Sequence, residues 1–195
     1  MGKEGMTGVT EKTPKNILFG AGTIHKGLKY EGGKWNFEES LYGATKGGSK
    51  LTITPEVTPL ELDGALVAVK GLNVKTGEVA TMELNFAELT LETVRIASMA
   101  KESAENDSTE YKLLESKPTI EEGDYWDNVA FVGKLLDGRK VIVIMDNALA
   151  TSGLELGTAN KEHAVATVTF ACHADLTSDL DVLPWHIYFP NEKTA

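Results

Sequence analysis

A glycine-rich segment near the start of the chain, residues 20–27, has residue types found in nucleotide-binding loops. Such loops need glycines at fixed spacing, because their backbone must approach the phosphates closely. Gly20 and Gly22 fit the first two positions of the pattern, but His25 occupies the third. The segment also lacks the Gly-Lys-Ser/Thr ending of a phosphate loop. We therefore predict a glycine-bearing strand or β-bulge, and no cofactor.

The histidines and the single cysteine, Cys172, are the candidates for metal or thiol chemistry. The histidines are His25, His163, His173 and His186. None belongs to an HxH or HxxxH pair, and Cys172–His173 lacks the further ligands that zinc requires. Cys172 lies in an apolar strand-like run, which is typical of a small packed side chain. We predict no metal site.

The sequence also lacks the patterns expected for catalysis by a serine hydroxyl or by a pair of carboxylates. Ser152-Gly153 lacks the G-x-S-x-G context of a nucleophile elbow. The acidic pairs Glu38-Glu39 and Glu121-Glu122 are adjacent in sequence, so their side chains diverge instead of converging on one bond. We predict that the chain is not an enzyme.

Charge is distributed unevenly along the 195 residues, which carry a net charge of −10. The first 50 residues have 8 lysines and 5 acids (+3), whereas the remainder has 11 basic and 24 acidic residues (−13). Tight binding of nucleic acid needs clustered cations that displace counterions. The acidic body therefore predicts either a surface that is simply soluble or one that touches nucleic acid without holding it.

Three features that bear on cellular location are a membrane span, a secretory signal and paired cysteines. No stretch approaches the roughly 18 consecutive apolar residues of a membrane span. The first eight residues contain no apolar core of a secretory signal. One cysteine cannot form an internal disulfide, which fits synthesis in a reducing cytoplasm.

Strand patterns dominate the elements that would position these residues. Alternating or continuous apolar runs predict strands at residues 50–55, 65–70, 78–86, 163–173 and 185–189, with a turn at 75–77. Residues 129–145 predict a hairpin around Asp137-Gly138 of type I′, whose central residues both need positive φ. One helix is expected from an N-cap at Thr90 to about Lys101. The class is therefore mainly β, or α+β, in one domain, 1–195.

Two segments look like arms. Residues 1–16 are polar and should be mobile unless bound. Residues 31–49 predict a long loop with five glycines that also carries aromatic residues. Because aromatics in a loop cannot form a core of their own, we expect this loop to become ordered against a partner.

Several segments, taken in order, resemble the tail tube proteins (major tail proteins) of long-tailed bacteriophages. They cover most of the chain and are residues 16–22, 42–50, 60–65, 69–71, 82–90 and 183–190. The resemblance implies two packed antiparallel β-sheets, as a sandwich or barrel, with one flanking α-helix. It also implies six copies in a ring, and rings stacked into a tube around a tape-measure protein.

Further expectations follow from the resemblance. The tube would end at tail terminator and baseplate proteins, would be assembled in the cytoplasm of the bacterial host, and would belong to the virion tail. DNA would pass through the lumen as cargo without specific binding, and no membrane would be involved. We expect lumen-facing acids at Glu78 and Glu83. The expected contacts between rings come from the 31–49 loop, through Lys34, Trp35, Phe37, Leu41 and Tyr42.

Three other functions remain open at this stage. A tube subunit of a contractile tail or tailocin would share the fold. A carbohydrate-binding β-sandwich would need exposed tryptophans, among Trp35, Trp126 and Trp185, to stack on sugar rings. A small enzyme with an unrecognised site would need a pocket with convergent polar groups.

Overall fold

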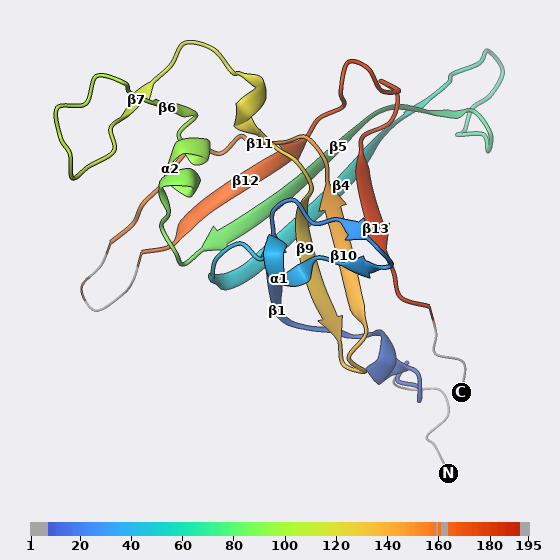
Figure 1. Ribbon diagram of the computed structural model, residues 1–195. Helices are drawn as coiled ribbons and strands as arrows, with labels where there is room; N and C mark the ends of the chain where they lie inside the picture. The colour runs from blue at the N-terminus through green and yellow to red at the C-terminus, as the bar shows by residue number, and fades with distance from the viewer. Residues whose placement is uncertain (1–7, 159, 161–163, 192–195) are drawn as a thin grey trace.

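The computed structural model describes residues 8–158, 160 and 164–191, and these fold mainly as antiparallel β-sheet. Two larger sheets pack against each other (Figure 1). The four-stranded sheet, in spatial order, consists of β1 (Leu18–His25), β9 (Val129–Leu135), β10 (Lys140–Met145) and β13 (Trp185–Tyr188). The five-stranded sheet, in spatial order, consists of β4 (Thr45–Pro59), β5 (Asn73–Phe86), β12 (Ala166–Cys172), β11 (Ala148–Ala150) and β8 (Tyr125–Trp126). The predicted β-rich fold class is confirmed.

Smaller elements surround these two sheets. Two-stranded sheets are formed by β2 (Tyr30–Glu31) with β3 (Lys34–Trp35) and by β6 (Ala100–Glu102) with β7 (Leu114–Ser116). The helical segments are η1 (Thr13–Asn16), α1 (Phe37–Ser40), α2 (Leu91–Ala97) and η2 (Glu122–Asp124). None of the helices within the described ranges has the length and apolarity needed to span a membrane.

The core lies between the two sheets and follows from residue alternation along the strands. Every second side chain of β5, from Ala80 to Phe86, and of β12, from Ala166 to Cys172, is buried. They pack against side chains of the four-stranded sheet, including Val129, Val143 and Met145. Since successive strand residues point to opposite faces, this alternation leaves the other face of β5 and β12 polar.

The β9–β10 hairpin is confirmed, but its turn is of a different type. Gly138 has φ +89°, whereas Asp137 is not in the positive-φ region that a type I′ turn requires of both residues. The Gly138 N–H donates to the Leu135 carbonyl at 2.8 Å, and the Leu135 N–H donates to the Arg139 carbonyl at 2.8 Å. This is the three-residue connection in which a turn is closed by one left-handed glycine.

The β4–β5 hairpin is much longer than the sequence indicated. Residues 65–70, predicted as a strand, are a loop at its end, and the predicted turn at 75–77 lies inside β5. The loop closes through the Leu60 N–H, which donates to the Leu72 carbonyl at 2.7 Å. No strand pairs beside this loop in the described chain, so its apolar run has no sheet on which to become a strand.

The predicted helix begins as expected and ends early. The Thr93 N–H donates to the Thr90 side chain at 3.1 Å, which confirms the N-cap. The helix stops at Ala97 instead of continuing to Lys101, because Met99 has φ +49° and turns the chain into β6. The strands predicted at 163–173 and 185–189 are confirmed as β12 and β13, although His163 lies outside the described residues.

The two predicted arms contain more structure than the sequence indicated. Residues 31–49 are not one continuous loop, because they include β3, α1 and the first residues of β4. Within residues 1–16, the first seven lie outside the described part, and η1 begins at Thr13.

A β-bulge lies in β1 at the glycines that first suggested a nucleotide loop. The register with β9 shifts between Phe19 and Thr23, where Gly20 and Gly22 both have positive φ. The predicted bulge is therefore confirmed. A Cβ on Gly22 would press into the Phe131 ring and lie 2.9 Å from the Val132 carbonyl oxygen, whereas one on Gly20 would meet open space.

We predict that Gly22→Ala lowers the free energy of unfolding by about 3 kcal/mol, because a left-handed backbone cost adds to a steric clash. Gly20→Ala, the matched control, adds only the backbone cost, about 1–2 kcal/mol. Urea unfolding of the two variants gives the comparison. Equal losses would show that the space beside Gly22 is not restricting.

Candidate functional site

The aromatic residues that the sequence assigned to a partner contact are packed on the chain itself. Trp35 and Phe37 cover a second cluster of buried side chains, Leu28, Ala130, Val132, Ile142 and Ile144, on the far side of the four-stranded sheet. The Trp35 ring meets the Tyr188 ring edge-on, with centroids 4.8 Å apart. Tyr42 similarly meets Trp126, with centroids 4.8 Å apart. Residues 31–49 are therefore held in place by contacts of these rings with other parts of the same chain.

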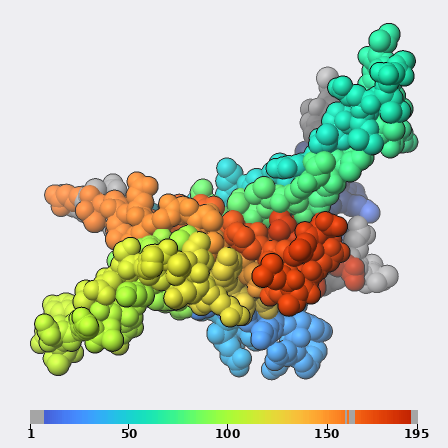
Figure 2. Space-filling view, turned by 90° about the horizontal axis from the view of Figure 1, so that it is seen from above, coloured from blue at the N-terminus to red at the C-terminus, as the bar shows by residue number. Residues whose placement is uncertain are grey.

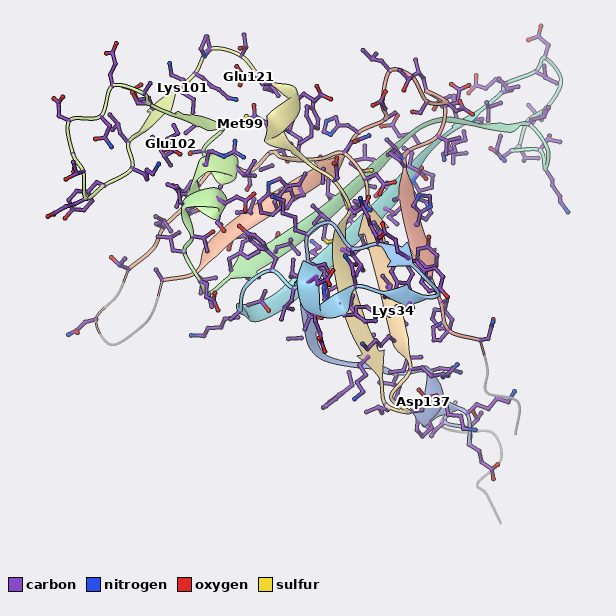
Figure 3. The ribbon with its side chains drawn as sticks, viewed as in Figure 1. Lys34, Met99, Lys101, Glu102, Glu121 and Asp137 are labelled. Atoms are coloured by element: carbon purple, nitrogen blue, oxygen red, sulfur yellow. The ribbon has the colours of Figure 1, made fainter. Side chains whose placement is uncertain are left out.

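Two other residues of the predicted contact, Lys34 and Leu41, are exposed. Lys34 lies on the two-residue strand β3, which Figure 3 places over the four-stranded sheet. Leu41 follows α1 and forms an isolated bridge with His25. A contact between rings through this segment stays a prediction, and it would involve Lys34 and Leu41 more than the packed rings.

The two predicted lumen acids point to opposite faces of β5. Glu78 shares a face with Ala80 and Met82, and its side chain is 11% exposed. Its carboxylate pairs with Lys75 Nζ at 3.0 Å and accepts a hydrogen bond from Trp185 Nε1 at 3.1 Å. The bonds from Lys75 and Trp185 lower the pKa of Glu78. The carboxylate is thus held against the body, and Glu83 is the acid on the outward face.

Across β4, β5 and β12, the outward face of the five-stranded sheet carries hydroxyls, one amide and one pair of opposite charges, whereas Ala171, Leu149 and Tyr125 continue this face toward β8. Its side chains, alternating with the core positions, are Lys50, Thr52, Thr81, Glu83, Asn85, Thr167 and Thr169. Glu83 stands directly across from Lys50 on β4 and Thr169 on β12. The Thr167 hydroxyl donates to Asn85 Oδ1 at 2.6 Å, and Asn85 Nδ2 donates to the Gly48 carbonyl at 3.1 Å. We call this surface the hydroxyl face.

Strand β4 is an open edge. It has 15 residues, and within the described chain its only hydrogen-bonded neighbour in the sheet is β5, although β1 also lies close to it. The pairing of β5 with β12 ends at Thr81, which lies opposite Ala171. From there toward Asn73, β5 pairs only with β4 among the described strands, so this outer half of the hairpin is a two-stranded ribbon. Figure 2 shows this ribbon standing clear of the body. Such a ribbon is marginally stable alone in water.

Arg139 ties both ends of the described chain to the β9–β10 turn. Its guanidinium donates to the carbonyls of Lys15 (3.0 Å), Pro190 (3.2 Å) and Asn191 (3.1 Å), and it pairs with Asp137 at 2.5 Å. The side chain is 9% exposed. Figure 3 places Asp137 at the end of the four-stranded sheet, beside the N-terminal segment. Both terminal segments therefore leave the body at one end.

A buried ion cluster fixes the approach to β8. Asp124 pairs with Lys117 at 2.6 Å and with Arg95 at 3.6 Å, and it accepts a hydrogen bond from the Glu121 N–H at 2.8 Å. Burial alone would raise the pKa of Asp124, but the Glu121 N–H and Lys117 outweigh it and lower that pKa. Figure 3 shows Glu121 on the segment that returns from β7 toward β8. Because Arg95 belongs to α2, the cluster fixes the segment between β7 and β8 to that helix.

The described histidines, His25, His173 and His186, lie in different parts of the fold. His25 is buried, with Nδ1 2.9 Å from Ser40 Oγ and Nε2 2.9 Å from Thr23 Oγ1. Because the Ser40 hydroxyl donates to Asn36, it accepts from Nδ1–H. Burial, followed by the charge of Lys140, lowers the pKa of His25.

Cys172 is buried and is not poised as a nucleophile. Burial, followed by the charges of Asp146 and Glu78, raises the pKa of the thiol to about 12. The thiol therefore stays protonated near neutral pH, and it donates to the Asp146 carbonyl at 3.4 Å. Within the described ranges, no three His, Cys, Asp or Glu side chains come together as a metal site would require.

Comparisons with known proteins find similarity among solved structures. No protein-family model and no curated protein sequence matches the chain. Among solved structures, a chain from the virion of a native gene transfer agent particle aligns with 12% sequence identity and a TM-score of 0.41. The alignment covers 80% of this chain and 92% of that one.

We predict that Arg139→Lys lowers the free energy of unfolding by about 1–3 kcal/mol, because an ammonium cannot replace the fork that binds several carbonyls. Amide exchange of residues 13–19 should accelerate with it, as followed by mass spectrometry. Lys140→Met is the control, since it removes a neighbouring charge that touches neither terminus. Unchanged exchange in the Arg139 variant would contradict the assigned role.

Proposed function

We propose that this chain is the structural subunit of a phage tail tube. Six copies form a ring, rings stack into a tube around a tape-measure protein, and the genome passes through the lumen. The six-fold number and the partners come from the resemblance of the sequence to tail tube proteins. The observation that carries the proposal is the β4–β5 hairpin, which offers an open edge and an uncovered apolar tip.

The open edge of β4 supports lateral assembly. An edge strand presents unpaired N–H and C=O groups, and monomeric proteins usually keep such edges short, charged or covered. Residues 49–54 of β4 are in regular register with β5 and contain no proline, whereas the register shifts between Thr45 and Ser49, and Pro55 and Pro59 restrict pairing further out. A neighbouring copy that pairs with residues 49–54 would extend the five-stranded sheet across the seam. Repeated around a closed ring, such pairing removes the edge.

The hydroxyl face supports a lumen that DNA can traverse. Continuing the five-stranded sheet around a ring would give a wall with one apolar side and one hydroxyl-bearing side. Threonine and asparagine side chains wet such a wall, and the charge of Lys50 lies opposite that of Glu83. Sustained binding of phosphates needs clustered cations, and the chain after residue 50 has a charge of −13. DNA would therefore pass without being held.

The packing of the three tryptophans does not favour the carbohydrate-binding alternative. A sugar platform needs an exposed ring face, but Trp126 is 3% exposed and stacks on Phe170 at 5.1 Å. Trp35 is partly buried against Tyr188, and Trp185 is partly buried and bonded to Glu78. None of the three offers the free ring on which that alternative depends.

We predict that concentrated protein forms rings or hollow tubes in negative-stain microscopy. A variant in which residues 61–71 are replaced by Asn-Gly should keep the fold and form no long tubes, because the apolar tip is absent. Circular dichroism checks that the shortened hairpin leaves the body intact. Wild-type protein that remains monomeric at every concentration and salt level would overturn the proposal.

The lumen assignment has a separate test in assembled phage. Glu83→Lys should leave tubes intact and slow DNA ejection severalfold, because two facing lysines would bind phosphates that slide past. Glu102→Lys, on the peripheral strand β6, is the matched charge control and should eject normally. Equal ejection rates in both variants would contradict the assignment of the hydroxyl face to the lumen.

A further inference from the structure

The tip of the β4–β5 hairpin is an apolar surface with acidic neighbours. Its exposed apolar side chains are Leu60, Leu62, Leu66, Val67 and Val69, and Leu66 is 99% exposed. Glu61 and Asp63 lie between them in the sequence and are also exposed. The loop curves around a hollow of about 680 Å³ that these same residues line. We call residues 60–72 the hairpin tip.

A second exposed apolar surface lies where the N-terminal segment meets the β9–β10 turn. Phe19 pairs across the sheet with Lys134, and the Leu136 N–H donates to the Ile17 carbonyl at 3.0 Å. By alternation these four side chains share one face, and Phe19 is 70% exposed. We call Ile17, Phe19, Lys134 and Leu136 the terminal patch.

The terminal patch is basic at its border and fixed in position. Lys15 and Lys134 are exposed beside its apolar residues. Arg139 holds the Lys15 carbonyl at 3.0 Å, which sets the path of the segment that leads into Ile17. The patch is thus a preformed surface, with its apolar side chains presented by a pinned backbone.

The two surfaces complement each other and cannot meet within one molecule. The hairpin tip combines leucines with two carboxylates, and the terminal patch combines large apolar side chains with lysines. Figure 1 shows the hairpin tip at the top and the N-terminal segment at the bottom of the molecule, at opposite ends. A tip can therefore reach only the patch of another copy.

We infer that the hairpin tip of one copy docks on the terminal patch of a second copy. The contact is heterologous, because different surfaces meet, so it propagates instead of closing a dimer. Leu66 and Phe19 supply the apolar contact, and Asp63 faces Lys134. This inference rests on the proposed function in naming the contact between stacked layers, although the docking itself requires no ring.

The test uses two variants that each damage one surface. Leu66→Asp destroys the tip and leaves the patch, whereas Phe19→Asp destroys the patch and leaves the tip. Both side chains are exposed, so folding should survive, and circular dichroism checks it. Leu176→Asp alters an equally exposed leucine, 92% exposed, outside both surfaces and is the matched control.

Each damaging variant alone should lose stacking, with association at least about tenfold weaker, while the control stacks normally. An equimolar mixture of the two variants retains one intact tip and one intact patch. Analytical ultracentrifugation of the mixture should show complexes of two layers that grow no further. Asp63→Lys and Lys134→Glu should each weaken stacking, and their combination in one chain should restore part of it.

The outcomes separate this inference from the proposed function. If rings do not form, the mixture should still give a one-to-one heterodimer, which supports the docking and overturns the ring. If both variants form long tubes, the docking is overturned while the tube stands. Wild-type monomers together with a mixture that shows no heterodimer would overturn both.

Discussion

The structure depends on the packing of two sheets through strands whose side chains alternate strictly. In residues 80–86 of β5 and throughout β12, every second residue, among them Met82, Leu84 and Phe170, enters the core. A shift of one residue in either strand would turn the apolar set to solvent and the hydroxyls inward. The same alternation that builds the core therefore also produces the hydroxyl face, so core and candidate lumen are two sides of one pattern.

Features that depend on short-range chemistry could be predicted from the sequence. The β9–β10 hairpin, the alternation in β5 and β12, and the Thr90 cap need only neighbouring residues and the two-residue or 3.6-residue period. The turn type was wrong because Asp-Gly is compatible with more than one connection. Leu136 became part of a three-residue loop, in which Gly138 alone takes positive φ.

Features that depend on distant contacts could not be predicted. An apolar run such as residues 65–70 indicates a strand only if another strand lies beside it, and the β4–β5 hairpin carries this run beyond its neighbours. Trp35 and Phe37 were expected to contact another molecule, because the β9–β10 surface that they cover is about a hundred residues away in the sequence. Glu78 was expected to face the lumen together with Glu83, but it shares the core face with Ala80, on the opposite side of β5 from Glu83. Its hydrogen bond with Trp185, which is distant in the sequence, could not be predicted.

The net charge of the chain bears on how the proposed assembly would be controlled. Copies with a net charge of −10 repel one another, and this repulsion opposes contact through the open β4 edge. The first 50 residues carry a net charge of +3, and they contribute Ile17, Phe19 and the first six residues of β4 to the surfaces proposed for assembly. Repulsion between copies is therefore weakest at these proposed surfaces. Since salt screens exposed charges beyond about 10 Å at 0.1 M, added salt relieves the overall repulsion more than the short-range contacts, which are apolar and backbone interactions.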